Sequence, residues 1–155
     1  MFFWNKRFKF VRKLNLYSDE IYLALQRTID ADSELGMVPV YIFDICLIAT
    51  DERAGSCELR VGYNDSIYYT GNIGYTVFMK HRGNRYAMKA CLLLFELAKK
   101  HNMKKLIITC NPDNAASAKT CDLLGAKYIT TVDIPPDNIM YILGDRQKMI
   151  YEVIL

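Results

Sequence analysis

The chain has 155 residues and a mass of 17.9 kDa, enough for one domain around one hydrophobic core. Hydrophobic residues make up 52% and charged residues 24%, a balance that excludes a largely disordered or collagen-like chain. The formal net charge is +3, yet five basic residues and no acid fall within residues 1–13, so the remainder has 15 basic against 17 acidic residues. Because nucleic-acid-binding domains spread basic charge over a folded face, we predict no nucleic-acid partner. The basic N-terminal residues are then a solvated edge: Lys6, Arg7, Lys9, Arg12 and Lys13.

The five cysteines indicate reduced thiols rather than a disulfide framework. Their number is odd, no CxxC pair occurs, and several lie in apolar stretches. With only two histidines, no His/Cys cluster has zinc-ligand spacing, so we predict no metal site. We find neither the apolar core of a signal peptide nor an apolar run near the ~20 residues of a membrane helix. We therefore predict a cytoplasmic protein without membrane contact and a single domain over residues 1–155.

The first half of the chain predicts mainly strands. Residues 8–14 alternate aromatic and basic side chains, which favours a half-exposed strand. Ser18, with Asp19 and Glu20 behind it, is typical of a helix start, and we predict a helix to about Ala31. Aromatic and β-branched residues predict further strands: 40–50 and 56–63 as a hairpin, then 71–78.

The second half alternates helices with strands. Apolar residues recur at helical spacing over 85–102, and residues 106–110 are typical of a strand in the middle of a sheet. A helix between Asn114 and Gly125 follows. Strands are predicted over 126–134 and 147–155, with a turn at 135–138. The fold class is α+β, with a single mixed, mostly antiparallel sheet of about seven strands flanked by helices.

The loop at residues 81–87, between a strand and the long helix, carries the strongest chemical signal. Free N–H groups at a helix start, in a loop that Gly83 allows to bend, form a cradle for an anion. Small Ala87 permits close approach, and Arg82 and Arg85 add positive charge, so a pyrophosphate is the natural ligand. The alternative is a plain strand-to-helix turn with solvated arginines.

The loop and its surroundings, residues 72–129, resemble the acyl-CoA-binding core of the GNAT N-acetyltransferase superfamily. The order of strand, pyrophosphate loop, long helix, Asn-terminated strand and Gly-terminated helix matches that family, although Arg85 stands where members usually have a second loop glycine. The resemblance implies acetyl-CoA as acyl donor and a homodimer as an expectation. It also implies these cofactor-binding residues: Tyr75, Val77, Arg82, Gly83, Asn84, Arg85, Tyr86, Ala87, Asn111 and Asn114.

The resemblance offers two residues that would serve the departing thiolate. Many members carry a Tyr four residues before the helix-ending glycine, where this chain has Cys121. The N-x-x-S pattern from Asn114 to Ser117 resembles the branch that acetylates the N-termini of ribosomal proteins, in which the Ser assists the thiolate. Ser117 is our first candidate and Cys121 the second.

The sequence leaves several alternatives for the base that accepts the amine proton. An alkylamine with a pKa near ~10.4 must lose a proton before it attacks. Many family members have a carboxylate on the strand corresponding to 106–110, but this strand has no acid. Glu58, Asp44 and a relayed water are the alternatives, with Glu58 equally readable as a surface acid paired with Arg60. Three tyrosines are candidates for lining an acceptor pocket: Tyr63, Tyr68 and Tyr69.

Taken together, the sequence predicts an N-acetyltransferase that moves an acetyl group from acetyl-CoA to a primary amine by direct attack in a ternary complex. The amine belongs to a small molecule or to a protein N-terminus. The main alternative is a non-catalytic acyl-CoA-binding or sensing module of the same fold, because the strand carboxylate and the usual Tyr are both missing.

Overall fold

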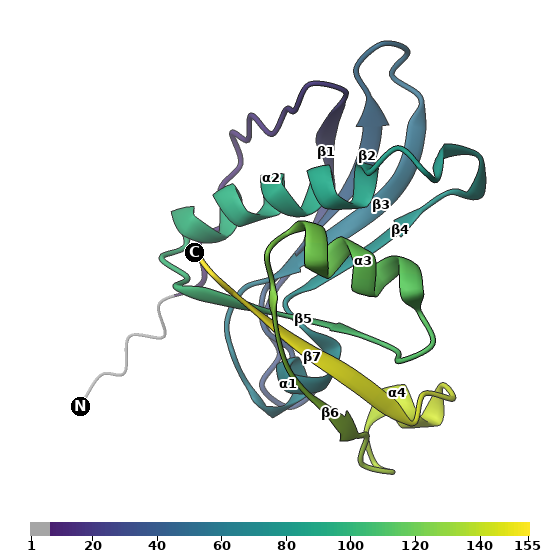
Figure 1. Cartoon of the computed structure of the whole chain (residues 1–155). Coiled ribbons are helices and arrows are strands. Elements are labelled where there is room, and N and C mark those ends of the chain that lie inside the picture. The colour runs from purple at the N-terminus through teal and green to yellow at the C-terminus, as the bar shows by residue number, and fades with distance from the viewer. Residues whose placement is uncertain (1–6) are drawn as a thin grey trace.

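A computed structural model describes residues 7–155 and shows two antiparallel sheets packed with helices (Figure 1). The first sheet has the order β1 (Ile21–Ile29), β2 (Val40–Leu47), β3 (Arg53–Arg60) and β4 (Ile73–Val77). The second has the order β5 (Lys105–Cys110), β7 (Gln147–Ile154) and β6 (Lys127–Asp133). The helices are α1 (Asp65–Thr70), α2 (Tyr86–Lys100), α3 (Ala115–Leu123) and α4 (Ile139–Ile142), with a 3₁₀ turn at Met79–His81.

The predicted α+β fold with about seven mostly antiparallel strands is confirmed, but the strands divide between two sheets instead of forming one. The division falls between β4 and β5, which diverge in Figure 1. The two strands are joined through Asn72, whose N–H donates to the Ile107 carbonyl at 2.7 Å and whose Oδ1 accepts from the Ile107 N–H at 2.8 Å. The strand predicted over 106–110 is β5, which lies at one edge of the second sheet. The expected position in the middle of a sheet is therefore wrong.

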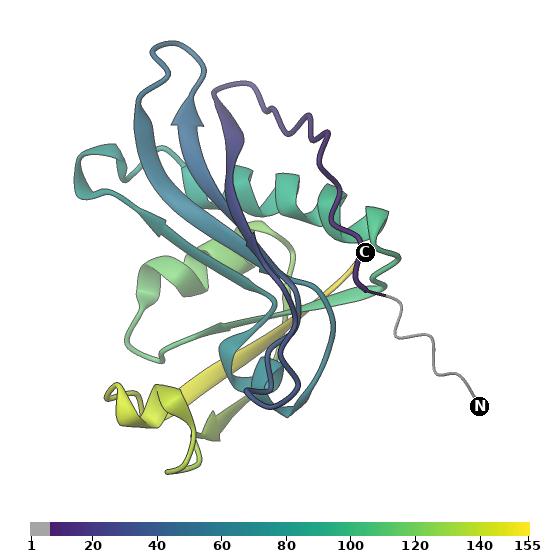
Figure 2. The same ribbon diagram turned by 180° about the vertical axis from the view of Figure 1, so that it is seen from behind.

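Helix α2 covers one face of the first sheet and supplies the core. Its buried positions follow helical spacing: Ala90, Cys91, Leu94, Phe95, Leu97 and Ala98. They pack against the inward residues of the strands, such as Tyr41 and Phe43, which are fully buried. Within residues 7–155, the opposite face of this sheet has no long helix over it, as Figure 2 shows.

The helix predicted from Ser18 to about Ala31 is wrong, because these residues form β1. Ile21 and Leu23 are buried while Tyr22 and Ala24 are half-buried, which is the alternation of a strand. Ser18 does accept from a backbone N–H three residues ahead, that of Ile21 at 3.1 Å, but there it closes a turn into the strand. Pairing with β2 along the whole strand outweighs the local helix signal.

The strand predicted over 8–14 is also wrong, since this segment has no ladder partner. It lies against the core through its aromatic residues. The Phe10 ring meets Tyr41 edge to face at 5.0 Å, and the Val11 N–H donates to the Tyr41 hydroxyl at 2.7 Å. Of the five basic residues near the N-terminus, Lys6 lies outside the described residues.

The other predicted elements are confirmed within a few residues, and two short helices were missed. Helix α1 lies between the strands predicted at 56–63 and 71–78, and α4 follows the turn predicted at 135–138. None of the helices within residues 7–155 is long and apolar enough to cross a membrane.

Candidate functional site

A groove of about 620 Å³ lies beside β4, between the start of α2 and one side of α3. Most of the residues predicted to bind the cofactor line it: Tyr75, Val77, Arg82, Gly83, Arg85, Tyr86, Ala87 and Asn114. Ser117 lines it as well, whereas Asn84, Asn111, Cys121 and Glu58 do not. The sequence analysis missed Ala116, Thr120 and Leu123, although their spacing on the helix places them on one face with Ser117.

The loop before α2 leaves the helix start open to a ligand. Arg85 is the N-cap residue and forms no side-chain capping bond, so the first N–H groups of α2 have no side-chain partner among the described residues. Asn84 instead closes the loop, because its Nδ2 donates to the His81 carbonyl at 2.9 Å. Arg82 donates from Nε to the Val77 carbonyl at 3.1 Å and so fastens the loop to the end of β4. The result is the uncapped, positively charged helix start that the sequence predicted.

Two residues of this loop have a left-handed backbone. Gly83 has φ +86°, and a Cβ built there would meet nothing within 4 Å. Arg85 has φ +61° and ψ +26°, a conformation that costs a non-glycine residue free energy. The glycine that family members usually have at this position would avoid this cost. Arg85 in its place therefore strains the backbone of the loop.

Two hydroxyl groups meet inside the groove. Tyr75 on β4 and Ser117 on α3 share a hydrogen bond of 2.7 Å. Asn114 caps α3 by accepting from the Ser117 N–H at 3.1 Å, which fixes the first turn that carries Ser117. Burial raises the pKa of Tyr75 to about 12, so its hydroxyl stays protonated at neutral pH.

Cys121 and Glu58 lie away from this pair. Cys121 is fully buried in the core, and burial raises the pKa of its thiol to about 12. Glu58 on β3 forms an ion pair with Arg60 and lies against Gly74, its partner on β4. Because side chains alternate along a strand, Glu58 occupies the face of the sheet opposite α2. Asp44 is on the same face and pairs with Arg53 at 2.7 Å.

Asn111, predicted to bind the cofactor, belongs to a polar cluster with Asp145 and Lys148. Its Nδ2 donates to Asp145 Oδ1 at 2.9 Å, and its Oδ1 accepts from Lys148 Nζ at 2.6 Å. Lys148, whose side chain is 7% exposed, also pairs with Asp145 at 2.9 Å. That hydrogen bond is the largest cause lowering the pKa of Asp145. The cluster joins the end of β5 to the start of β7 and the residues just before it.

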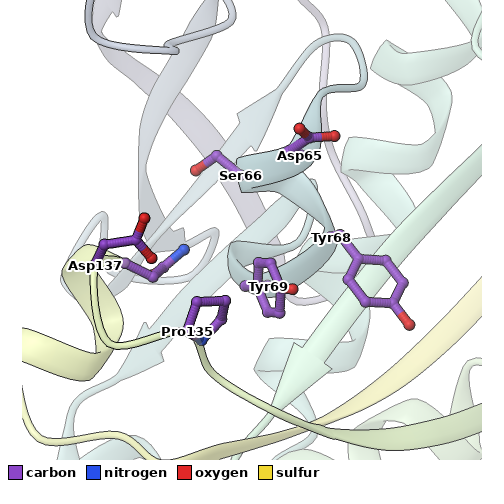
Figure 3. Close-up of a pocket in the computed structure, with 7 residues that line it drawn as sticks. Asp65, Ser66, Tyr68, Tyr69, Pro135 and Asp137 are labelled. Atoms are coloured by element: carbon purple, nitrogen blue, oxygen red, sulfur yellow. The ribbon is translucent and has the colours of Figure 1, made fainter.

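A second cavity, of about 540 Å³, lies between α1 and the segment that follows β6 (Figure 3). Its lining includes two of the three tyrosines proposed for an acceptor pocket, Tyr68 and Tyr69, but not Tyr63. Helix α1 is tied to β5, because Thr109 Oγ1 donates to the Tyr69 carbonyl at 2.8 Å. Cys110 and Ile108 of β5 are buried in the α2 core, so Thr109 faces the other way. The two cavities therefore lie on opposite sides of β5.

The comparisons with known proteins agree with this arrangement. The family model described as an acetyltransferase (GNAT) domain matches residues 6–127. The search of curated proteins found no match. The chain belongs to the GNAT acetyltransferase family, which confirms the resemblance seen in the sequence.

Solved structures share the fold at low identity. A GNAT-family acetyltransferase from Bacillus anthracis is 20% identical, with a TM-score of 0.59 over 73% of this chain and 65% of that one. A ribosomal-protein-S5-alanine acetyltransferase from Vibrio fischeri is 17% identical, with a TM-score of 0.59 over 74% and 61%. The microcin C7 self-immunity acetyltransferase, in complex with acetyl-CoA and AMP, is 18% identical, with a TM-score of 0.58 over 75% and 61%. The chain thus spans less than two thirds of the length of each of these three.

The strain at Arg85 predicts a difference between two substitutions. Arg85→Gly and Arg85→Ala both remove the guanidinium, but only glycine adopts φ +61° without steric cost. We expect the glycine variant to be more stable than the alanine variant by about 1 kcal/mol, measured as the free energy of unfolding in urea. Equal stability, or a more stable alanine variant, would contradict a strained loop.

The cluster around Lys148 predicts a pH-dependent stability. In Asp145→Asn the buried Lys148 loses its ion pair, and we expect a loss of about 3 kcal/mol at pH 7. Because the folded pKa of Asp145 is lowered, its contribution is present above the ordinary carboxyl pKa and disappears as pH falls through the folded value. The difference between the wild type and the variant in urea unfolding should therefore shrink in acid. A difference that stays constant down to the lowest pH at which both proteins fold would rule out this linkage.

Proposed function

We propose that this chain acts as a single acyltransferase domain over residues 1–155 and transfers an acetyl group from acetyl-CoA to a primary amine by direct attack in a ternary complex. The observation that carries the proposal is the hydroxyl pair of Tyr75 and Ser117, which lies in the same groove as the open, positively charged start of α2. A purely structural groove has no need for two protonated hydroxyls beside an anion cradle.

The groove fits the phosphate end of acetyl-CoA. The first N–H groups of α2 are uncapped and carry the positive end of the helix dipole, which suits a pyrophosphate. Arg82, Arg85 and Lys119 all line the groove and add positive charge. At Gly83 the backbone is open to close approach, since no atom lies within 4 Å of its Cβ position.

When bound, acetyl-CoA supplies an activated thioester carbonyl. The chain's own contribution begins with Ser117, whose hydroxyl we assign as the proton donor to the leaving sulfur. Tyr75 donates to or accepts from Ser117 at 2.7 Å, and with a pKa of about 12 it serves as a donor rather than a base at neutral pH. Tyr75 thus takes the place of the helix tyrosine that is missing at Cys121.

The amine would approach from the other face of the first sheet. Glu58 lies there, packed against Gly74, one residue before Tyr75. It remains our candidate for accepting the amine proton, directly or through water. Arg60 competes for the carboxylate, since it binds Glu58 and also donates to the Gly71 carbonyl at 3.1 Å. The neighbouring structures include an enzyme named for a ribosomal protein, which supports a protein N-terminus as one class of amine.

A backbone substitution in the cradle tests cofactor binding. Gly83→Val places a β-branched residue at φ +86° and should weaken acetyl-CoA binding at least about tenfold in isothermal titration, because the loop can no longer present its N–H groups. Gly36→Val is the matched control: Gly36 also has a positive φ, +64°, but lies in the β1–β2 connection, outside the groove. Equal affinities in the two variants would remove the cradle from the proposal.

The hydroxyl pair is tested by turnover. Ser117→Ala should lower kcat about a hundredfold and leave acetyl-CoA affinity unchanged, since general-acid catalysis contributes that much or more. Tyr75→Phe should give a smaller loss, because Ser117 remains. The measurement is CoA thiol release with a panel of amines and N-terminal peptides, in which Glu58→Gln is included.

Cys121→Ala separates the two leaving-group candidates. Because its thiol is buried in the core, we expect lower stability and unchanged turnover. Full activity of Ser117→Ala combined with a loss in Cys121→Ala would transfer the role to the cysteine. Acetyl-CoA binding without thiol release across the panel would favour the non-catalytic module.

A further inference from the structure

Three polar side chains form a closed ring of hydrogen bonds at the end of β5, outside the groove. Asn111 Nδ2 donates to Asp145 Oδ1 at 2.9 Å, and Lys148 Nζ lies 2.9 Å from Asp145 Oδ2 and donates to Asn111 Oδ1 at 2.6 Å. The Asn111 amide has one favourable orientation, because a flipped amide would turn its NH₂ group toward the ammonium and its oxygen toward the carboxylate. None of the three residues lines the groove or the cavity beside α1.

Lys148 is an unusual residue for such a ring. Of the lysines and arginines in residues 7–155, only Lys148 is buried. Taking an ammonium out of water costs free energy that an ion pair barely recovers, and an apolar side chain in its place would often stabilise a core as well or better. Stability alone thus gives little reason for a lysine at this point of β7, whereas the geometry that the ring enforces does.

The ring holds the turn that leads from β5 into α3 (Figure 1). The Asn111 carbonyl accepts from the Asn114 N–H at 2.9 Å, which closes this turn, and the Asn114 side chain accepts from the Ser117 N–H at 3.1 Å. Ser117 in turn shares the 2.7 Å hydrogen bond with Tyr75. An unbroken path of hydrogen bonds, each linked to the next within one residue, thus runs from Lys148 to the hydroxyl pair.

The first turn of α3 depends on these polar contacts because the helix has little packing of its own. Of its nine residues only Cys121 is buried, whereas α2 has six buried residues. Cys121 lies about one helical turn after Ser117, so burial anchors the later part of the helix. A segment with few buried apolar contacts moves easily unless hydrogen bonds hold it, and here those bonds come from the ring and from Asn114.

We propose that Lys148 is a positioning residue for acetyl transfer: with Asp145 it fixes Asn111, and through the turn that Asn111 closes it sets Ser117 against Tyr75. This inference rests on the proposed function, in which Ser117 gives a proton to the leaving sulfur. A proton donor works only within hydrogen-bond reach of its acceptor, and a misplacement of about 1 Å costs a large factor in rate. Lys148 acts through this geometry and needs no contact with a substrate.

The test removes the ammonium without shortening the side chain. Lys148→Met keeps a chain of similar length, and Asp145, whose side chain is 25% exposed, is hydrated when it loses the ion pair. We expect hydrogen exchange at the Ser117 N–H, followed by NMR, to become about fivefold faster or more, since the N-cap contact from Asn114 is weakened. Exchange at Leu94, in the middle of α2, should not change.

Turnover is measured on the same proteins as CoA thiol release. In Lys148→Met we expect kcat to fall about tenfold because Ser117 is misplaced. The KM for acetyl-CoA should stay within about twofold of the wild type, since no residue of the ring lines the groove. A role confined to folding would lower the free energy of unfolding but leave Ser117 exchange and the kcat of the folded protein unchanged.

Asn111→Ala is the second variant. It breaks the ring at the turn and leaves the ion pair between Lys148 and Asp145 in place, so it keeps the test valid if Lys148→Met folds poorly. It should give the same two effects, faster exchange at Ser117 and a lower kcat.

Lys89→Met is the matched control. The Lys89 side chain is 15% exposed, pairs with Asp19 and Glu20, and lies outside the groove. The substitution therefore removes a lysine with acidic partners from a place that has no hydrogen bond to α3. It should leave Ser117 exchange and kcat unchanged.

The outcomes separate this inference from the proposed function. Unchanged exchange at Ser117 in either folded variant, or faster exchange with an unchanged kcat, overturns the positioning role of Lys148 even if acetyl transfer occurs. An equal effect of Lys89→Met does the same, because the change would then be a general loosening. Faster exchange in both variants, when the wild type releases no thiol with any amine, supports the link from Lys148 to Ser117 and refutes the proposed acetyl transfer.

Discussion

One buried amide determines how the two halves of this protein meet. Asn72 is fully buried, and each of its polar groups has a partner. Its backbone continues the first sheet by accepting from the Arg60 N–H, and the N–H and Oδ1 together bind Ile107 of the second sheet. The side-chain NH₂ group holds the β3–α1 connection at the Arg60 and Gly62 carbonyls. A side chain thus replaces the strand ladder at this point, and β4 and β5 separate beyond it because nothing continues the pairing.

The separation gives β5 two different sides. The groove on the side of α2 and α3 has an uncapped helix start, which favours an anion, and two hydroxyls that share a hydrogen bond. The cavity on the α1 side is lined by two tyrosines of that helix, Tyr68 and Tyr69, and by the segment after β6.

The sequence predicted those parts whose signals are local. The apolar spacing of α2, the 81–87 loop and Asn114 at the start of α3 can each be recognised within about a dozen residues, and all three are where the pattern placed them. The prediction for residues 21–29 was wrong because Ser18, Asp19 and Glu20 resemble a helix start. The pairing of this segment with β2, which makes it a strand, can be seen only in the fold. The hydrogen bond between Tyr75 and Ser117 joins residues that are 42 positions apart, so no local sequence pattern predicts it. The partners of Asn111 escaped the sequence analysis for the same reason, since Asp145 and Lys148 lie more than 30 residues further along the chain.

The departure from the family pattern at Cys121 is explained by this geometry. A cysteine at that position is fully buried among core residues and does not line the groove, so its thiol is not available to a ligand there. A tyrosine hydroxyl enters the groove nonetheless, from the strand on the opposite wall, and meets a serine one helical turn before the cysteine. The acetyl transfer that we propose requires a protonated hydroxyl near the leaving sulfur, and it does not require that the hydroxyl come from a particular helix. Because Asn114 fixes the first turn of α3 and β3 fixes β4, the two hydroxyls are held by separate parts of the scaffold. Such a pair is positioned before any ligand arrives, which is the arrangement that lowers the cost of reorganisation during a proton transfer.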